Sequence, residues 1–148
     1  MKKNILLAAI ATTAFAASSA SAAIINLDSV SGTWTASNPG APAVTGLTTN
    51  EIRWGNPSGQ PNQSGYKFEG AAPPQVLVTE GVNFDLGRFT HFNFPITAPS
   101  LESAELTVES VIDIDGIDNM ITSVFQFDHF ETVNSSQPCA DGGTNGVG

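Results

Sequence analysis

Apolar and polar residues alternate along much of this chain, most regularly over residues 103–115. Alternate positions of that segment form one face, which is apolar apart from one serine: Ala104, Leu106, Val108, Ser110, Ile112 and Ile114. A period of two over this length predicts a β-strand with one face on a core and the other in water. Residues 120–131 follow with Ile121, Phe125 and Phe127 on one face, and the intervening DGIDN predicts a hairpin turn.

Shorter runs before this hairpin also predict strands. They cover residues 23–35, 49–55, 65–70, 75–81 and 82–96. The 14 glycines and 9 prolines fall between the apolar runs, and no segment after residue 22 has helical periodicity over three turns. Short strands separated by turn residues predict an all-β domain, namely a β-sandwich of the jelly-roll type or a related Greek key.

The first 22 residues form a unit of their own. A pair of lysines precedes an apolar stretch over residues 5–17, and small residues then lead to an A-x-A site that ends at Ala22. This order is typical of a secretory signal peptide that is cut before Ala23. The alternative, a membrane-spanning helix, needs roughly 20 apolar residues, which is more than this stretch contains. We therefore expect an exported protein, secreted or at the cell surface, whose residues 23–148 form a single domain without a membrane span.

The charge of the mature chain limits its partners. Removing the leader takes away two lysines and no acid, so the net charge moves from −9 to −11. Arg53, Lys67 and Arg88 are the fixed positive charges that remain. Nucleic acid and anionic lipid bind clustered Lys and Arg, so we expect neither as a partner. The acidic composition suits solubility outside the cell, and it also suits cation binding.

Cys139 is the only cysteine, which is unusual for an exported chain because cysteines outside the cell normally pair. A catalytic thiol needs a base and a positive environment, and residues 135–148 supply neither. The sequence also stops at Gly148 within a loop-like run. We therefore expect the domain to be truncated at its C-terminus, with the disulfide partner of Cys139 beyond Gly148.

Four motifs occur in a fixed order along the mature chain. They are W-G at residues 54–55, S-G-Y-x-F-x-G at 64–70, L-G-x-F-T-H-x-N-x-P-I at 86–96 and H-x-E-T-x-N at 129–134. Together they resemble the choice-of-anchor K domain of secreted bacterial proteins. The resemblance implies an exported β domain at the cell surface, and it brings no established activity. Members of that family usually carry a C-x-D motif after a stretch like TNGVG, where this sequence stops.

The only two histidines lie in these motifs, with Asn93 close to His91 and with Glu131 and Asn134 close to His129. Two histidines and a carboxylate can ligate zinc or iron, and the same polar set could contact a ligand. The third interpretation, which we favour, is that they hydrogen-bond within the fold at strand ends, because half-buried polar groups must be satisfied. Spacing alone leaves open whether the two histidines meet in space.

The direction of the side chains in residues 87–96 is a separate question. Alternation divides them into two sets: Phe92, Phe94 and Ile96 on one side, and Phe89, His91 and Asn93 on the other side or at its edge. We expect the phenylalanines of this segment, Phe92 and Phe94 among them, to build the core. His91 and Asn93 are then expected to hold the fold and to take no part in catalysis.

Residues 113–119 combine turn residues with oxygen ligands. Asp113, Asp115, Asp118 and Asn119 offer the hard oxygen atoms that calcium prefers. The segment lacks the complete EF-hand loop and its terminal glutamate, and Asp and Gly are ordinary hairpin residues. Calcium is therefore an alternative to a plain turn, and we expect no other cofactor.

The sequence contains little that is typical of enzymes. It lacks a G-x-S-x-G elbow and a phosphate-binding glycine loop. We expect a non-catalytic domain with a structural or adhesive role, whose partner is an extracellular glycan or cell-surface matrix. The alternative is a carbohydrate-binding module in which exposed aromatic rings stack on sugars, with Trp34, Trp54 and Tyr66 as candidates. Against it stands the interpretation that these large aromatic residues are core.

Overall fold

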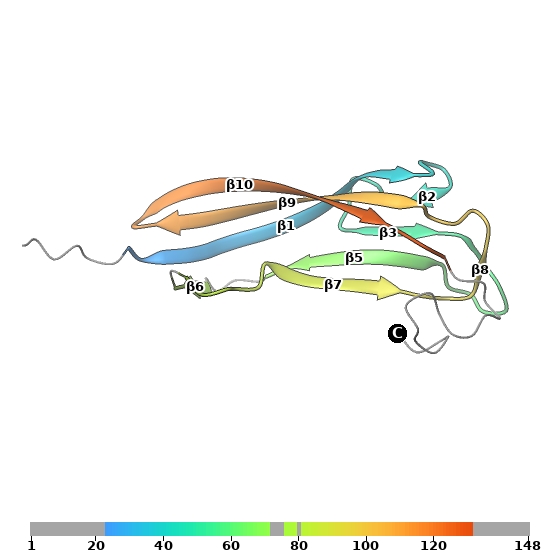
Figure 1. The fold of residues 1–148 in the computed structure, drawn as a ribbon, viewed down its shortest axis with the longest axis horizontal. Coiled ribbons are helices and arrows are strands. Elements are labelled where there is room, and N and C mark those ends of the chain that lie inside the picture. The colour runs from blue at the N-terminus through green and yellow to red at the C-terminus, as the bar shows by residue number, and fades with distance from the viewer. Residues whose placement is uncertain (1–22, 72–75, 80, 132–148) are drawn as a thin grey trace, which may run out of the picture.

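The computed structural model describes residues 23–71, 76–79 and 81–131, which are arranged as layers of antiparallel strands (Figure 1). One four-stranded sheet has the order β6(Val76–Val78), β1(Ile25–Asn38), β9(Ser103–Ile114) and β10(Ile117–Asp128). The other has the order β2(Val44–Thr45), β3(Glu51–Trp54), β5(Ser64–Gly70) and β7(Gly87–Phe92). A small two-stranded sheet joins β4(Asn56–Pro57) to β8(Ile96–Thr97).

This architecture confirms the predicted all-β sandwich. The described ranges contain strands, turns and loops only, and so they include no helix that is long and apolar enough to cross a bilayer. The expected signal peptide, Asn134 and Cys139 lie outside the described residues. Their predicted roles therefore stay predictions.

The hairpin of β9 and β10 is tighter than the sequence pattern suggested. Ile114 pairs with Ile117, so the turn consists of Asp115 and Gly116 alone. Both turn residues have positive φ, 53° and 85°, which is the pattern of a type I′ turn and suits the right-handed twist of the strands. The prediction of a five-residue turn over 115–119 was wrong, because residues 117–119 already belong to β10.

The core lies between the two large sheets and is rich in aromatic rings. Trp34 on β1 and Trp54 on β3 are fully buried, and both contact the ring of Tyr66 on β5. Phe68 on β5 packs so closely on β1 that a Cβ at Gly32 would collide with its ring. The interface between the sheets therefore requires a residue without a side chain at position 32.

The predicted apolar face of β9 is confirmed over most of its length and fails at the hairpin end. Ala104, Leu106, Val108 and Ser110 are all buried, whereas Ile114 is exposed. The reason is the unequal length of the sheets, since β9 and β10 each have 12 residues while β5 has 7 and β7 has 6. The hairpin end of the first sheet extends past the strands that cover it (Figure 1).

The expected direction of side chains in β7 was wrong. Tyr66 pairs directly with His91, and Phe68 pairs with Phe89. Residues that face each other across two strands share one side of the sheet, so Phe89 and His91 lie on the inner side with Tyr66 and Phe68. Because β7 is the edge strand, Phe89 and His91 nevertheless remain exposed, whereas Tyr66 and Phe68 are buried. Phe92 therefore lies on the outer side, where the guanidinium carbon of Arg53 is 3.9 Å from the centre of its ring.

The residues after β7 change their direction again. Phe94 is half-buried, and its N–H and C=O both bond the hydroxyl of Ser64 at 3.1 Å. Ile96 in β8 is buried, as expected, and fills space beside Gly55. A single strand over 82–96 was therefore not found, because the backbone leaves the sheet after Phe92 and pairs with β4 from Ile96.

Candidate functional site

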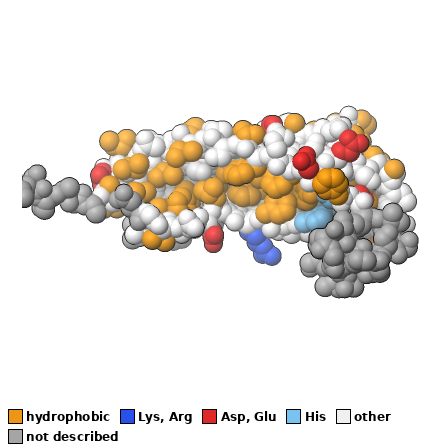
Figure 2. Space-filling view, viewed as in Figure 1, with side chains coloured by type: hydrophobic (Ala, Val, Ile, Leu, Met, Phe, Trp, Pro, Cys, Tyr) orange, Lys and Arg blue, Asp and Glu red, His pale blue; other side chains and the backbone are white. Residues whose placement is uncertain are grey.

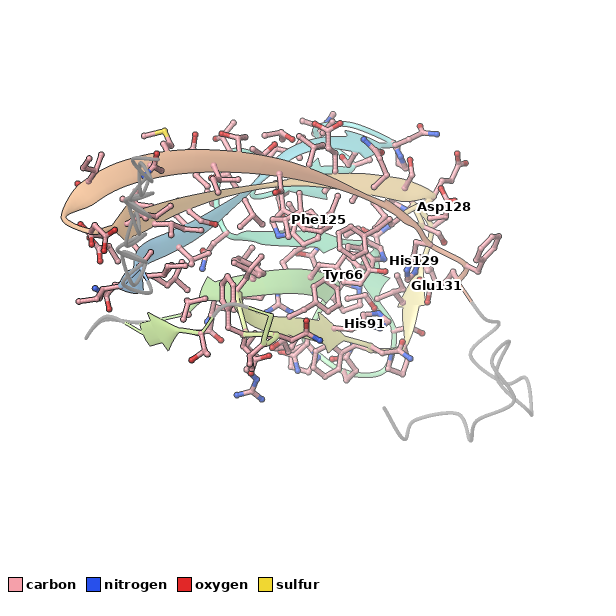
Figure 3. The ribbon with its side chains drawn as sticks, turned by 60° about the vertical axis from the view of Figure 1, so that its left-hand side comes forward. Tyr66, His91, Phe125, Asp128, His129 and Glu131 are labelled. Atoms are coloured by element: carbon pink, nitrogen blue, oxygen red, sulfur yellow. The ribbon has the colours of Figure 1, made fainter. Side chains whose placement is uncertain are left out.

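The structure brings the two histidines together. The rings of His91 and His129 have their centroids 5.6 Å apart and stand at 89° to each other. Tyr66 and Glu131 complete this group, which we call the histidine cluster: Tyr66, His91, His129 and Glu131. Figure 3 shows the cluster between the two layers, at the end of the sandwich where β10 stops.

Each member of the cluster is positioned by backbone pairing. Tyr66 and His91 are partners across β5 and β7, which sets them side by side on the inner face of that sheet. His129 follows β10 directly, and its backbone N–H donates to the carbonyl oxygen of Glu102 at 2.8 Å. The cluster therefore joins residues of one sheet to the chain that leaves the other.

His129 is hydrogen-bonded at both ring nitrogens. Nδ1 lies 2.6 Å from the hydroxyl oxygen of Tyr66, and Nε2 lies 3.1 Å from Oε2 of Glu131. A carboxylate only accepts, so Nε2 carries the hydrogen toward Glu131, and in the neutral imidazole Nδ1 then accepts from the phenol of Tyr66. Burial and the negative charge of Glu131 raise the pKa of Tyr66 to about 12, so that the phenol keeps its proton well into the alkaline range. The side chain of His129 is only 7% exposed.

His91 packs in the cluster through ring contacts. Its ring lies edge-on to Tyr66 at 5.0 Å and is stacked against Trp54 at 6.4 Å. Burial lowers the pKa of His91, the positive charge of a protonated His129 lowers it further, and Glu131 acts in the opposite direction. The protein therefore favours the neutral form of His91.

The geometry of the cluster does not suit zinc or iron. A metal site needs ligand atoms that converge on one point, and within the described residues only Asp28, Asp113 and Asp118 place three such atoms within 4.8 Å of one another. Both nitrogens of His129 are already bonded to Tyr66 and Glu131. The interpretation that the histidines form hydrogen bonds within the fold describes His129 best. Its hydrogen-bond partners are the side chains of Tyr66 and Glu131.

The remaining polar candidates are Asn93 and Asn134. Asn93 is exposed, one residue beyond the end of β7. Asn134 lies outside the described residues. The structure therefore brings together Tyr66, His91, His129 and Glu131 from the predicted ligand set. Sequence reasoning missed the bond between Tyr66 and His129 because 63 positions separate them.

The aromatic candidates for stacking on sugars are buried. Trp34 and Trp54 are 0% exposed and Tyr66 is 6% exposed. A sugar platform needs a flat ring face in solvent, and none of these three rings offers one. The alternative interpretation, in which they are core residues, describes their positions.

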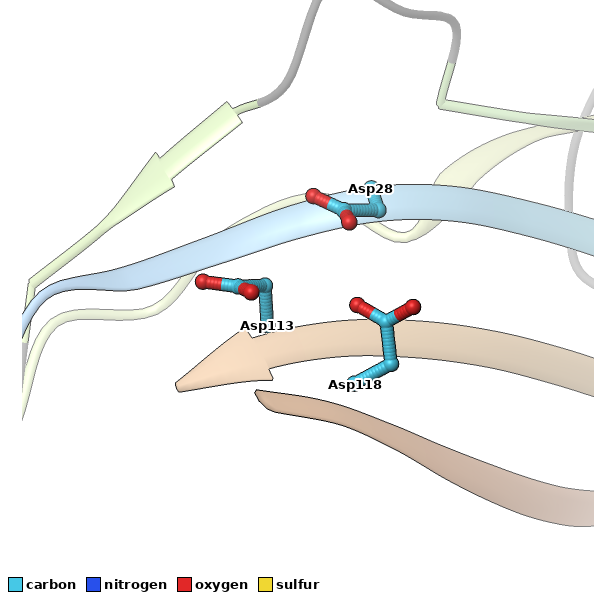
Figure 4. A group of neighbouring side chains, drawn as sticks. All are labelled: Asp28, Asp113 and Asp118. Atoms are coloured by element: carbon cyan, nitrogen blue, oxygen red, sulfur yellow. The ribbon is translucent and has the colours of Figure 1, made fainter. Parts of the chain in front are cut away.

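The acidic turn forms a different set from the one predicted. Asp113 and Asp118 are paired across β9 and β10, and Asp28 of β1 completes the group within 4.8 Å (Figure 4). Asp115 instead accepts from the N–H of Ile24 at 2.9 Å. The amide of Asn119 donates to the carbonyl oxygen of Ile117 at 2.9 Å. Calcium binding at this turn stays a prediction. The carboxylates that the structure brings together as candidate ligands are those of Asp28, Asp113 and Asp118, without Asp115 and Asn119.

Asp28 could not be found from spacing within the turn, because it lies on another strand. The pairing of β1 with β9 is irregular between Leu27 and Ser29, and Asp28 is the residue at this irregularity. A bulged residue changes the direction of its side chain relative to its neighbours. This irregularity is how a strand residue far away in the sequence joins two residues of the hairpin.

Comparison with known proteins finds no family model that matches this chain and no curated protein that matches it. The resemblance to the choice-of-anchor K domain therefore rests on the four motifs alone. The structure adds that the second, third and fourth motifs supply Tyr66, His91 and the pair His129 and Glu131, which meet in one cluster.

Proposed function

We propose that this chain is an exported, non-catalytic β-sandwich domain with a structural or adhesive role at the cell surface. The observation that carries the proposal is the bonding of His129 in the histidine cluster, where both of its ring nitrogens are bonded to protein groups. A general base must come within hydrogen-bond distance of the proton that it takes from a substrate. His129 has no ring nitrogen left for that task, and its side chain is buried.

The arrangement has a plain structural purpose. Tyr66 belongs to β5 in one sheet, and His129 follows β10 of the other. Their hydrogen bond, together with the ring contacts of Trp54 to both residues at 4.9 Å and 5.1 Å, ties the two sheets at one end of the sandwich. A domain held in this way is suited to display at a surface, where it must persist without cytoplasmic chaperones.

Export is supported by the sequence of the first 22 residues, with their two lysines, apolar stretch and A-x-A site. The motif resemblance points in the same direction. The carbohydrate-binding alternative has less support, because its candidate rings Trp34, Trp54 and Tyr66 are core residues.

The proposal is tested by producing the full chain in a bacterium beside a version that lacks residues 2–22. We expect the full chain to be exported, with Ala23 as its first residue, and the shortened chain to stay in the cytoplasm. Protease added to intact cells should then remove only the exported form if it stands on the surface. Cells that display it should adhere to one another or to a matrix-coated surface more than cells with the shortened chain.

Two outcomes would contradict this function. An intact Met1 on all of the protein, with no protein outside the cytoplasm, would remove the basis for a surface role. Specific binding of the purified chain to one polysaccharide on a glycan array would replace the structural or adhesive role by carbohydrate binding.

A further inference from the structure

Strand β10 lies at the edge of its sheet in the part of the chain that the structure describes. It is the last strand of its sheet, so among the described residues only β9 bonds to it. It has 12 residues, twice the length of β7, which is the edge strand of the other sheet on the same side. A long open edge presents a row of backbone N–H and C=O groups that can take a further strand.

The free edge of β10 is also uncharged and apolar. Between Asp118 and Asp128 it carries no Asp, Glu, Lys or Arg, although the whole chain has a net charge of −9. Both of its faces bear exposed apolar side chains, and on the outer face Met120 and Val124 are 73% and 56% exposed. Proteins usually protect such edges with charged residues, and β10 lacks this protection over its centre.

The hairpin turn decides which residues of β10 face the free edge. In a two-residue hairpin the flanking pair, here Ile114 and Ile117, is a hydrogen-bonded pair, and bonded and non-bonded pairs then alternate along the ladder. Odd-numbered residues of β10 therefore bond to β9. Even-numbered residues direct their backbone groups outward: Asp118, Met120, Thr122, Val124, Gln126 and Asp128.

We propose that β10 binds the β10 strand of a second copy of this chain, antiparallel and about a two-fold axis, so that two sheets become one continuous sheet. Two identical strands can hydrogen-bond about such an axis only if residues whose backbone groups point to the free edge lie opposite residues of the same kind. An axis at Thr122 satisfies this condition and pairs the strands over nearly their full length. It sets Met120 against the partner's Val124, and Asp118 against the partner's Gln126.

This register is distinguished from its neighbour by charge. Moving the axis to Ser123 keeps a similar overlap, but it sets Asp118 directly against the partner's Asp128. Like charges directly opposite each other in a strand pair are destabilising. Of these two registers, only the one with its axis at Thr122 keeps every carboxylate from lying directly opposite a carboxylate of the partner strand.

A groove beside β10 supports the same partner. Its volume is ≈ 210 Å³, and its lining is aromatic and aliphatic, with Phe89, Leu106, Phe125 and Phe127 among its residues. Figure 2 shows the apolar side chains as a band along the open side of the sandwich. With the axis at Thr122, the partner's Ile117 stands against Phe127 at this groove. A second copy would therefore cover apolar surface as well as pair backbone groups.

A second copy fits this edge better than a charged partner does. A basic partner would need acidic residues along the contact, and the centre of β10 has none. The two acidic bodies repel each other at a distance while the contact itself is uncharged, so salt should strengthen the association by screening that repulsion. A basic partner held by charge would show the opposite dependence. This inference does not rest on the proposed function, since pairing in solution does not require export.

The test uses purified chain from Ala23 to Gly148, which contains every described residue, with Cys139→Ser to remove the natural thiol. We expect sedimentation velocity to show a monomer–dimer equilibrium that shifts toward dimer with concentration and with added salt. Thr122→Lys, which opposes two positive charges on the axis, should weaken dimerisation by roughly tenfold or more. Thr45→Lys on the exposed edge strand β2 makes the same charge change away from β10 and should leave dimerisation as it was.

The register is tested by cross-linking with a short bis-maleimide. T122C should cross-link to itself, because the axis sets the two positions against each other. Q126C should not, because eight residues of strand, about 27 Å, separate the two copies of that position along the sheet. M120C and V124C should cross-link when the two variants are mixed and not when each is alone.

A chain that stays monomeric at all concentrations, with no cross-link of T122C, overturns the proposal. A dimer in which Q126C cross-links to itself and T122C does not overturns the register and the symmetric pairing. Binding of another protein to β10 while the purified chain remains monomeric also overturns it, because the occupant is then not a second copy.

Discussion

The hydroxyl oxygen of Tyr66 lies 2.6 Å from Nδ1 of His129, and this contact joins the two sheets across the aromatic core. Neither residue is at the surface, since Tyr66 is buried and the side chain of His129 is nearly so. A hydrogen bond inside such a core matters chiefly because removing one partner leaves the other unsatisfied. The contact therefore concerns stability, and the first predictions follow from it.

Tyr66→Phe should lower the free energy of unfolding by about 1–3 kcal/mol, because Nδ1 of His129 loses its donor in a buried place. The aromatic ring and its contacts remain, so the loss reports on the hydroxyl. Urea unfolding of both proteins measures it. Thr97→Val removes an exposed hydroxyl and should change stability by less than about 0.5 kcal/mol. Equal stability of the Tyr66 variant and the original protein would show that the contact adds nothing.

Tyr66 is the only tyrosine of the chain, so its ionisation can be followed directly by ultraviolet absorbance. The folded protein should titrate with a midpoint near pH 12, the raised pKa of Tyr66, against about 10 in denaturant. The folded state holds this proton more tightly than the unfolded state. The contribution to stability is therefore complete below about pH 10 and is lost as the pH rises toward the folded pKa. A folded midpoint near 10 would contradict the buried phenol.

His91 should make the protein less stable in mild acid. Its pKa is lowered in the folded state, so the unfolded chain takes up the proton first. The stability from neutral His91 is present above about pH 6.5 and is lost as the pH falls through the lowered folded value. His91→Gln does not titrate, so the difference in unfolding free energy between the two proteins should depend on pH across this range. A difference that stays constant with pH would refute the lowered pKa.

Two phenylalanines provide a matched comparison of core and surface. Phe68→Ala should cost about 3–5 kcal/mol, since the ring is buried between the sheets beside Gly32. Phe92→Ala should cost clearly less, because that ring is half-buried on the outer side under Arg53. Thermal or urea unfolding of both variants decides the point. If Phe92→Ala costs more, the assigned direction of β7 is wrong.

Calcium in the millimolar range should raise the melting temperature if Asp28, Asp113 and Asp118 bind it, because a ligand of the folded state stabilises that state by mass action. Asp113→Asn should abolish the increment. Without calcium the same change should stabilise the protein slightly, since it relieves repulsion between close carboxylates. Asp128→Asn, at the other end of β10, should keep the calcium response. Identical melting in calcium and in chelator would leave the hairpin as a turn without a metal.

Much of the fold follows from local patterns in the sequence. The alternation over 103–115 predicts the long strand β9 and most of its buried face, and the turn residues DGIDN predict a hairpin to the next strand, although the turn itself is only Asp115 and Gly116. Both results depend on local properties of the chain. One is the period of two of a pleated strand, and the other is the positive φ that Gly116 adopts easily. The all-β class and the aromatic core follow from the same kind of evidence.

The histidine cluster and the acidic group depended on the tertiary structure. A period of two divides Phe89, His91 and Phe92 into two sides, but it does not say which side faces inward. The pairing of His91 with buried Tyr66 decides this, and it puts Phe92 outside. In the same way, an irregularity in the pairing of β1 brings Asp28 to Asp113. Which face is buried and which distant residues meet are properties of sheet pairing and packing between distant segments, and no local pattern contains them.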